Sequence, residues 1–362
     1  MMRSRRRLAT GDRLLARSGA PSAPLRYPLS VTDRKSRGLG SRGAIRCSLR
    51  SQRGVALITA VLIVALATIL AVSVGFKGYL DQRRTATTFA LDQAFEVALG
   101  GEAWASDALR RDALQSPKTD DFTEEWATPI PPIPIEGGEF EGLLEDMQGR
   151  FNLNSLVIFE GGEYKVDKLA VERFARLLEI LEIEEKWATV IADWIDSDAD
   201  AGFPSGAEDS SYTSLTPAYR TANMPITRVS ELLAVAEFGL ERYRKLEPYV
   251  AALPIGSRIN LCTASMELLD ALVAGETSFT LGRESNAELR KQRCFPNKQE
   301  FESPLDNDVK EALSNVIDEK SSYFRSTIWV TIGTTQVTLY SLLYRTGATK
   351  LVRPILRSYG TL

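Results

Sequence analysis

The chain has 362 residues, enough for one large domain or two ordinary ones. It holds 44 basic and 47 acidic residues. Of these, 14 basic and 2 acidic residues lie in residues 1–54, which leaves 30 basic and 45 acidic residues for the remainder. The sequence contains no histidine, which excludes Ser-His-Asp and Cys-His catalysis and any zinc site that needs imidazole. The acidic remainder argues against nucleic acid as a partner, because phosphate binding requires a positive surface.

The N-terminal region combines a basic leader with an apolar segment. Residues 1–54 are rich in Arg, Pro, Ser and Gly, a composition typical of disorder. The 22 residues from Val55 to Phe76 carry no charge, and about 20 such residues span the hydrocarbon of a bilayer. Basic residues before an apolar span predict a cytoplasmic N-terminus and a body on the far side. An ordinary signal peptide, a plain signal anchor and a type IV prepilin-like leader cut between Gly54 and Val55 all compete for this segment.

The sequence after the apolar segment favours the prepilin-like leader, in which the segment is retained as the first half of a long helix. Residues 77–114 are predicted to continue that helix with an amphipathic pattern, since Phe95, Leu99 and Ala103 fall at helical spacing. Prepilin-type proteins usually carry Glu at the fifth residue after the cut. There its carboxylate neutralises the amine of a neighbouring subunit inside an apolar filament. In this chain the fifth residue is Thr59.

The body is predicted to be α+β, with a small antiparallel sheet on the long helix and a large inserted helical domain. Residues 115–150 read as a linker, with a Pro-rich extended connector over Ser116–Gly138, and then a first strand. Residues 321–362 alternate at period 2 and predict a three-strand meander, with Pro354 on an edge strand. A meander alone buries too little surface to stand independently, so it must share a core with the rest.

Residues 151–320 are predicted to form the inserted helical domain, of the SAM-like or helix-hairpin-helix kind. Its predicted helices are Val166–Leu181 with Asp167 as N-cap, Glu184–Asp196, Arg228–Phe238, Leu240–Leu246, Thr263–Val273 and Leu305–Asp318. The stretch "INLCTAS", from Ile259, echoes "FNLNSL", from Phe151, and indicates a weak internal repeat. Trp187 and Trp194 lie seven residues apart on an apolar helix face and are predicted to be core residues.

Three motifs in order resemble one known family. "RGVALI" at the leader, "EDMQGRFNLNSL" and "ADWIDSDADAGFPSGAEDSSYTSLTPAYRTANMPITRVSELLAV" are similar to the K-type minor pseudopilin of bacterial type II secretion, the general secretion pathway protein K family. The resemblance runs from about Gln52 to the C-terminus. Members of that family also lack the Glu after the cut, so Thr59 fits it.

The resemblance implies a non-catalytic, single-pass protein of the bacterial inner membrane, with most of its chain in the periplasm. The family caps the tip of a periplasmic pseudopilus and helps to initiate its assembly for export of folded proteins. The implied partners are the I- and J-type minor pseudopilins, the major pseudopilin and the inner-membrane secretion platform. Two alternatives are a minor pilin of a type IV pilus and a membrane-anchored periplasmic hydrolase that uses two carboxylates.

Residues 193–212 form an acidic loop that predicts a calcium site. The spacing of Asp196, Asp198 and Asp200 is that of an EF-hand start, but Ala201 replaces the required Gly and Glu208 lies one residue too far along. An EF-hand is therefore excluded. A calcium site of another kind, a solvated turn and a catalytic carboxylate pair remain, and the family resemblance implies calcium. The predicted ligands are Asp198, Glu208 and Asp209, followed by Asp196 and Asp200.

The cysteines are Cys47, Cys262 and Cys294. If the leader is removed, Cys262 and Cys294 are left in an exported body, where a pair of cysteines predicts one disulfide. The alternative is two buried free thiols.

Overall fold

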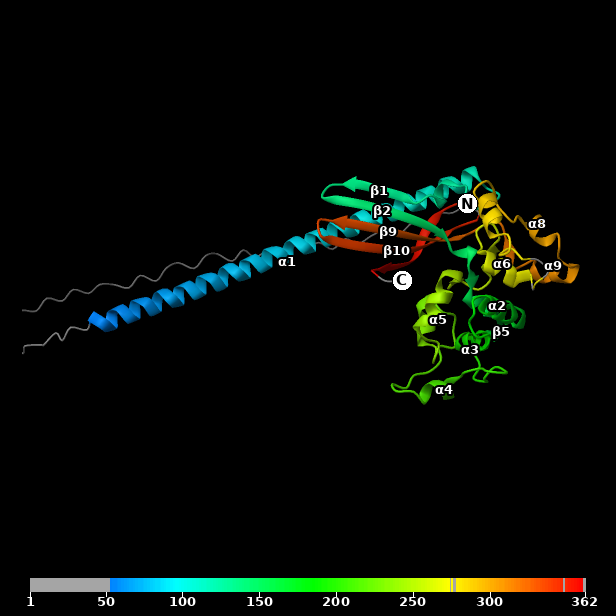
Figure 1. Ribbon diagram of the computed structural model, residues 1–362, viewed down its shortest axis with the longest axis horizontal. Coiled ribbons are helices and arrows are strands. Elements are labelled where there is room, and N and C mark those ends of the chain that lie inside the picture. The colour runs from blue at the N-terminus through cyan, green and yellow to red at the C-terminus, as the bar shows by residue number, and fades with distance from the viewer. Residues whose placement is uncertain (1–52, 274, 276–277, 348, 361–362) are drawn as a thin grey trace, which may run out of the picture. The chain divides into compact units, whose positions relative to one another are not determined.

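The computed structural model describes residues 53–360, apart from 274, 276–277 and 348 (Figure 1). The leader predicted over residues 1–54 lies outside the described residues except for its last two positions. The chain divides into two units between Leu70 and Ala71. Helix α1, Arg53–Gln115, begins in the first unit and ends in the second.

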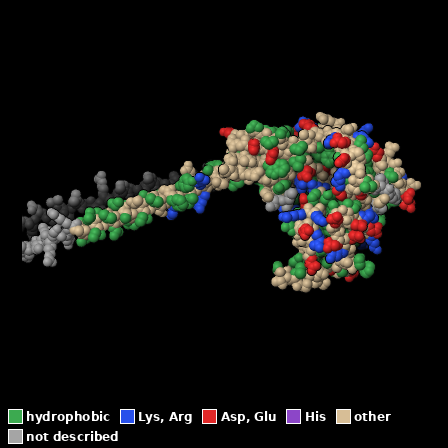
Figure 2. All heavy atoms as spheres, in the orientation of Figure 1, with side chains coloured by type: hydrophobic (Ala, Val, Ile, Leu, Met, Phe, Trp, Pro, Cys, Tyr) green, Lys and Arg blue, Asp and Glu red, His purple; other side chains and the backbone are tan. Residues whose placement is uncertain are grey.

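The described part of the first unit is the apolar beginning of α1. Every side chain from Val55 to Leu70 is exposed, and hydrophobic side chains cover the surface there (Figure 2). Among the described residues, α1 is long and apolar enough to cross a membrane by length and composition. Exposed Val, Ile and Leu side chains at this density are stable only where lipid or apolar protein covers them.

The second unit contains a five-stranded antiparallel sheet in the order β1–β2–β9–β10–β11 (Figure 1). Its strands are β1 (Ile130–Ile135), β2 (Gly138–Asp146), β9 (Tyr323–Ile332), β10 (Thr335–Arg345) and β11 (Val352–Tyr359). Strands β2 and β9 are paired from Gly138↔Ile332 to Asp146↔Phe324, although the whole helical block lies between them in the chain. The predicted α+β class, a small antiparallel sheet with a large helical insertion, is therefore confirmed.

The Pro-rich stretch Ser116–Gly138 is not the plain connector that the sequence predicts. Its second part forms β1, "IPPIPI", which pairs with β2 at the edge of the sheet. An edge strand tolerates proline because one row of its N–H groups has no ladder partner to satisfy. Residues 116–129, including the 3₁₀ turn Glu125–Ala127, remain as the connector between α1 and β1.

The second half of α1 packs on one face of the sheet through small side chains. Buried positions at helical spacing are Ala94, Ala98, Gly101 and Ala105. They face the hydrophobic side chains of β9 and β10, and a Cβ added at Gly101 would lie 3.0 Å from Ile328 Cγ2. Phe95 and Leu99, which the sequence places at helical spacing with Ala103, are only partly buried, and Ala103 is exposed. Small residues occupy the buried face because they let the helix backbone approach the sheet.

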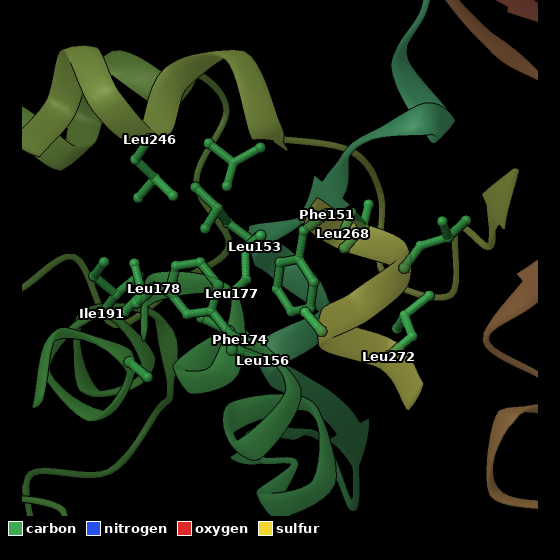
Figure 3. Packing of buried hydrophobic residues seen from close by; sticks show 14 of the residues in the cluster. Phe151, Leu153, Leu156, Phe174, Leu177, Leu178, Ile191, Leu246, Leu268 and Leu272 are labelled. Carbon is green, nitrogen blue, oxygen red and sulfur yellow. The ribbon is translucent and has the colours of Figure 1, made fainter. Parts of the chain in front are cut away.

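The inserted block holds the largest hydrophobic core. Its helices are α2 (Lys168–Ile180), α3 (Lys186–Ile195), α4 (Asp209–Thr213), α5 (Gly239–Leu246), α6 (Met266–Val273), α7 (Arg283–Arg290), α8 (Lys298–Glu302) and α9 (Asn307–Leu313). Figure 3 shows Phe174 of α2, Ile191 of α3 and Leu268 of α6 turned toward the same centre. Trp187 and Trp194 are buried, as predicted.

Local signals predicted some helices well and others badly. Asp167 caps α2 as predicted, since its Oδ1 accepts from the amides of Leu169 and Ala170. The helix predicted over Arg228–Phe238 is wrong: only a 3₁₀ helix, Val229–Ala234, forms there. The helix predicted over Leu305–Asp318 is too long, because Ile317–Asp318 becomes a strand, β8, that pairs with β7 (Ile259–Asn260).

The two echoing stretches adopt similar local structures. Strand β3 (Phe151–Asn152) pairs in parallel with β6 (Val250–Ala251), just as β7 pairs in parallel with β8. In each copy the asparagine Oδ1 accepts from the amide two residues on, 3.2 Å for Asn152 and 3.0 Å for Asn260. A hairpin, β4 (Val157–Glu160) with β5 (Glu163–Val166), follows the first copy only.

Cys262 and Cys294 form a disulfide, with their Cα atoms 4.6 Å apart. The bond joins the start of the second copy to the segment after α7, and both residues are buried.

A buried polar network joins the sheet to the inserted block. Asp146, at the end of β2, accepts from Asn260 Nδ2 (2.9 Å), Thr263 Oγ1 (2.6 Å) and Ser321 Oγ (2.6 Å). Asn260 Nδ2 also donates to the carbonyl of Asp120 in the connector, at 2.8 Å. Burial raises the pKa of Asp146, and these hydrogen bonds oppose that shift.

Candidate metal centre

The acidic loop brings three carboxylates together at the C-terminal end of α3. Asp193 lies in the last turn of α3 and Asp196 is its C-cap, so the two side chains are neighbours at i,i+3 spacing. Glu208 immediately precedes α4. One oxygen from each of the three lies within 4.8 Å of the others, and the residues are 1%, 2% and 4% exposed.

The oxygens of this cluster differ in how they are satisfied. Asp193 Oδ2 accepts from the backbone amides of Gly202 and Ala207, both at 2.9 Å. Asp196 Oδ1 and both carboxylate oxygens of Glu208 are buried and have no hydrogen-bond partner among the described residues. Buried polar atoms in native proteins are normally paired, so these oxygens are available to accept from water or to bind a cation.

Asn223 adds a neutral oxygen to the same region. Its Nδ2 donates to the carbonyl of Asp198 at 3.0 Å, while its buried Oδ1 lacks a partner among the described residues. Asn223 has a positive φ of 47°, a conformation that asparagine tolerates better than most residues. The backbone therefore directs the amide group toward the acidic loop.

The electrostatics of the cluster favour a cation. Burial, then the negative charges of Asp198, Asp193 and Glu208, raises the pKa of Asp196 to about 8. Burial and the charges of Asp193 and Asp198 likewise raise the pKa of Glu208 to about 7. A hard divalent cation would neutralise these charges and satisfy the free oxygens together, and oxygen-only ligands are those that Ca²⁺ prefers. The residues present therefore fit calcium.

The structure places the predicted ligands in two groups. Asp196 and Glu208 are in the cluster. Asp198 and Asp200 are exposed, and Asp198 Oδ1 accepts from the amide of Asp200 at 2.8 Å, which makes a local turn. The Asp209 carboxylate is used elsewhere, because it accepts from Thr221 and lies 3.2 Å from the Arg220 guanidinium.

Asp193 belongs to the cluster but was not among the predicted ligands. A signal for it is present in the sequence: Asp193 and Asp196 are three residues apart at the end of an apolar helix, and side chains at that spacing share a face. The EF-hand-like spacing of Asp196, Asp198 and Asp200 pointed instead to alternate residues of an extended loop. The loop turns away after Asp196, and so only its first member reaches the cluster.

A second carboxylate cluster lies near the end of α1. Asp112, Asp120 and Glu124 also bring oxygens within 4.8 Å of one another. Here the Arg345 guanidinium lies among them, 3.0 Å from Asp112 and hydrogen-bonded to Asp120. Because a protein cation already occupies this cluster, it is not a candidate metal centre.

An apolar membrane-length helix that continues onto an antiparallel sheet defines a pilin-like subunit, here with a helical block inserted in its sheet. Residues 149–255 match the family described as "Type II secretion system (T2SS), protein K". The chain is 34% identical over 321 residues to type II secretion system protein K of Pseudomonas aeruginosa, covering 86% of this chain and 94% of that protein. It is 32% identical over 320 residues to the protein of that name from Aeromonas hydrophila, covering 84% and 96%.

A solved structure agrees. The chain resembles one in the GspK–GspI–GspJ complex from the enterotoxigenic Escherichia coli type 2 secretion system, with a TM-score of 0.67, 25% identity, and coverage of 77% of this chain and 100% of that chain. The chain belongs to the type II secretion system protein K family, and the resemblance drawn from its motifs is confirmed. It is a minor pseudopilin, and its relatives are named as components of a secretion system.

We expect Gly206→Ala to distort the acidic loop. An added Cβ would lie 2.1 Å from Asp193 Oδ2 and 2.2 Å from the Gly202 nitrogen. The loop must therefore shift, which weakens the hydrogen bonds that backbone amides donate to Asp193. The expected loss of stability is about 1–3 kcal/mol, measured by chemical unfolding of the full chain.

The matched control is Gly347→Ala, where an added Cβ meets nothing within 4 Å. That variant should stay within about 0.5 kcal/mol of the parent. Equal stabilities for the two variants would contradict the role given to Gly206.

Proposed function

We propose that the chain caps the tip of a periplasmic pseudopilus, together with I- and J-type minor pseudopilins, and helps to initiate its assembly. The observation that carries the proposal is the likeness to the chain solved in the GspK–GspI–GspJ complex. The major pseudopilin and the inner-membrane platform are further proposed partners. The exported cargo would be folded proteins.

The position of the helical block supports a terminal location. The block lies between β2 and β9, the second and third strands of the sheet, and has its own core. A helical fibre stacks equivalent subunits along its axis, so each internal subunit must leave room for the next. A subunit that carries an additional domain of this size fits best at the end.

Thr59 supports the same location. Its hydroxyl donates back to the carbonyls of Val55 and Ala56, at 3.1 and 3.0 Å, and the residue brings no negative charge to the apolar helix. A subunit with another ahead of it would need a carboxylate to neutralise that neighbour's amine in an apolar setting. A tip subunit has no such neighbour.

A structural role also suits the carboxylates better than hydrolysis does. Glycoside hydrolases place two carboxyl groups about 5–5.5 Å or about 6.5–9.5 Å apart across an open substrate site. One oxygen each of Asp193, Asp196 and Glu208 lies within 4.8 Å of the others and the three residues are buried, which suits a bound ion better than an open substrate site. We therefore propose that the protein is non-catalytic.

The tip location is tested by immunogold labelling of pseudopili that carry an epitope at the C-terminus of this chain. Gold should decorate fibre ends only, because the inserted block prevents stacking. A parallel preparation with the epitope on the major pseudopilin should be labelled along the fibre. Labelling of this chain along the fibre would show that it is an internal subunit.

We propose that the apolar start of α1 is a single-pass inner-membrane anchor, with the N-terminus cytoplasmic, and that a prepilin peptidase cuts between Gly54 and Val55. The charge asymmetry of the chain supports the orientation.

The mass of the purified protein should correspond to a chain that begins at a methylated Val55. Gly54→Val should leave the leader attached, whereas Gly75→Val, within the same apolar run, should not. A wild-type protein that retains residues 1–54 would contradict the proposed cleavage between Gly54 and Val55.

We propose that Asp196, Glu208 and Asp193 hold a structural calcium ion, with Asp198, Asp200 and Asp209 shaping the loop around it. Calcium at about 100 times its dissociation constant would stabilise the fold by about 2.7 kcal/mol. Addition of calcium to the full chain in detergent should raise the midpoint of thermal unfolding, and EGTA should reverse the shift.

The calcium-dependent shift should disappear in Asp196→Asn and in Glu208→Gln, which remove the charges of the two carboxylates with free oxygens. It should persist in Asp200→Asn, because that side chain is exposed outside the cluster. An unfolding midpoint that is the same in calcium and in EGTA for the wild-type chain would retire the proposal.

A further inference from the structure

The second carboxylate cluster joins three segments that are far apart in the sequence. Asp112 comes from the last turns of α1, Asp120 and Glu124 from the connector, and Arg345 from the end of β10. Asp112, Asp120 and Arg345 are each more than nine-tenths buried, and Glu124 is half-buried. The connector is the only covalent path from α1 to the sheet, so this cluster fixes the start of that path.

Arg345 supplies the hydrogen bonds that hold the three segments together. Its Nη1 donates to Asp112 at 3.0 Å and to the carbonyl of Leu109 at 3.4 Å. Its Nη2 donates to Asp120 and, at 2.7 Å, to the carbonyl of Ser321. Asp120 in turn accepts from the amide of Ser321 at 2.8 Å. Nη1 and Nη2 thus each donate to one carboxylate and to one backbone carbonyl.

Glu124 is the carboxyl group that Arg345 does not reach with a described hydrogen bond. Its Oε2 accepts from Trp126 Nε1 at 2.6 Å and from the amide of Asp121 at 3.2 Å. One of its carboxyl oxygens lies within 4.8 Å of an oxygen of Asp112 and of an oxygen of Asp120. Two neighbouring carboxyl groups can form a hydrogen bond with each other only when one of them carries a proton.

The charges around the cluster leave Glu124 without compensation. Three carboxyl groups face one guanidinium. The other charged groups nearby are committed elsewhere: Asp121 accepts from Thr123, and Glu125 lies 3.9 Å from Arg111 in an exposed pair. With all three carboxyl groups ionised, the cluster would hold two negative charges in excess of Arg345. Burial makes that excess costly.

We propose that Glu124 carries a proton at neutral pH and donates it in a hydrogen bond to Asp112, and that loss of this proton in mildly alkaline solution loosens the connector from the end of α1. Arg345 and the carboxyl groups of Asp112, Asp120 and Glu124 are called the clasp below, because they hold the helix, the connector and the sheet together in a proton-dependent way.

The direction of the titration agrees with the geometry. Burial, with added repulsion from Asp112 and Asp120, raises the pKa of Glu124 from 4.5 to about 8, although the Trp126 hydrogen bond opposes the shift. Burial and Asp120 raise the pKa of Asp112 to about 6. A carboxyl with a raised pKa in the folded state binds its proton more tightly there than in the open state. The clasp is therefore tightest below pH 4.5, weakens as the pH rises, and is weakest above about pH 8.

The test uses Lys118, an exposed residue of the connector two positions before Asp120, as a trypsin site. The full chain in detergent is digested at a series of pH values between about 6 and 9, with Glu124→Gln digested beside it to cancel the pH dependence of trypsin. Cleavage after Lys118 in the wild-type chain, relative to the variant, should rise severalfold across this range. The largest possible rise in the cleavage ratio is about tenfold for each pH unit below the pKa of Glu124 in the folded protein. The partial exposure of Glu124 makes the expected rise smaller.

Glu124→Gln keeps the shape and the hydrogen-bond donor of the protonated acid but cannot ionise, so its connector should stay protected at alkaline pH. In Asp112→Asn the repulsion on Glu124 is lost, and the rise in cleavage should move to lower pH. Parallel curves for wild type and Glu124→Gln would overturn the proposal. So would a Glu124→Gln chain that is cleaved faster than wild type at pH 6, because the carboxylate would then be the form that holds the connector. Protection restored at pH 9 by calcium would identify the cluster as a cation site and overturn it as well.

Discussion

The arrangement of the second unit depends on one buried polar network that runs from Asp146 to Arg345. Asp146 ends β2 and receives hydrogen bonds from Asn260 and Ser321, which belong to the inserted block and its return to β9. The Ser321 amide donates to Asp120, and Arg345 donates to Asp120 and to Asp112 at the end of α1. An unpaired buried carboxylate or guanidinium would cost several kcal/mol, so these groups are stable only when all the segments are present together. The network thus specifies where the helical block leaves the sheet and where it returns.

This constraint explains how a small sheet carries a large insertion between two paired strands. Hydrophobic packing alone is not directional, and the main cores of the sheet and of the inserted block are separate clusters. Only a small cluster bridges them among the described residues, with Met147, Ala251 and Leu253 packed against Tyr323 and Leu342. The hydrogen bonds of Asn260 and Gln148 supply the missing direction: the Gln148 side chain donates to the Arg258 carbonyl at 2.7 Å and accepts from the Ser322 amide at 2.6 Å. Both residues lie at the base of the block, where its first and last segments meet the sheet. These hydrogen bonds hold the end of β2 near the start of β9, although the two strands are far apart in the sequence.

The features that sequence reasoning predicted are those with local causes. An uncharged run of 22 residues specifies the start of α1, and Asp167 before an apolar pattern specifies the start of α2. Several features with remote causes were missed, although the helical insertion between β2 and β9 was predicted. Pro131 and Pro134 indicate a loop, but their segment pairs with β2 at the edge of the sheet. Ile317 fits a helical pattern, but it pairs with Ile259 in a strand. At the candidate metal centre, Asp196 and Glu208 were predicted from their type and density. Asp193 was not, although it lies three residues before Asp196 on the same helix face; the amides of Gly202 and Ala207 then hold its carboxylate in place across the loop.

The two carboxylate clusters show two different answers to one electrostatic problem. Each brings three acidic side chains within 4.8 Å in a partly or fully buried place, where mutual repulsion and loss of hydration oppose ionisation. Near the end of α1, the chain itself supplies a counter-charge in Arg345, and every carboxyl group there has a hydrogen-bond donor. At the end of α3, the described part of the chain brings no basic side chain to Asp196 or Glu208, and three of their oxygens lack a donor. The proposed calcium ion would supply the positive charge that this part of the chain does not bring and would bind these oxygens. The same residue type therefore joins three segments in one place and forms the proposed ion site in the other, and the difference lies in whether an arginine reaches the cluster.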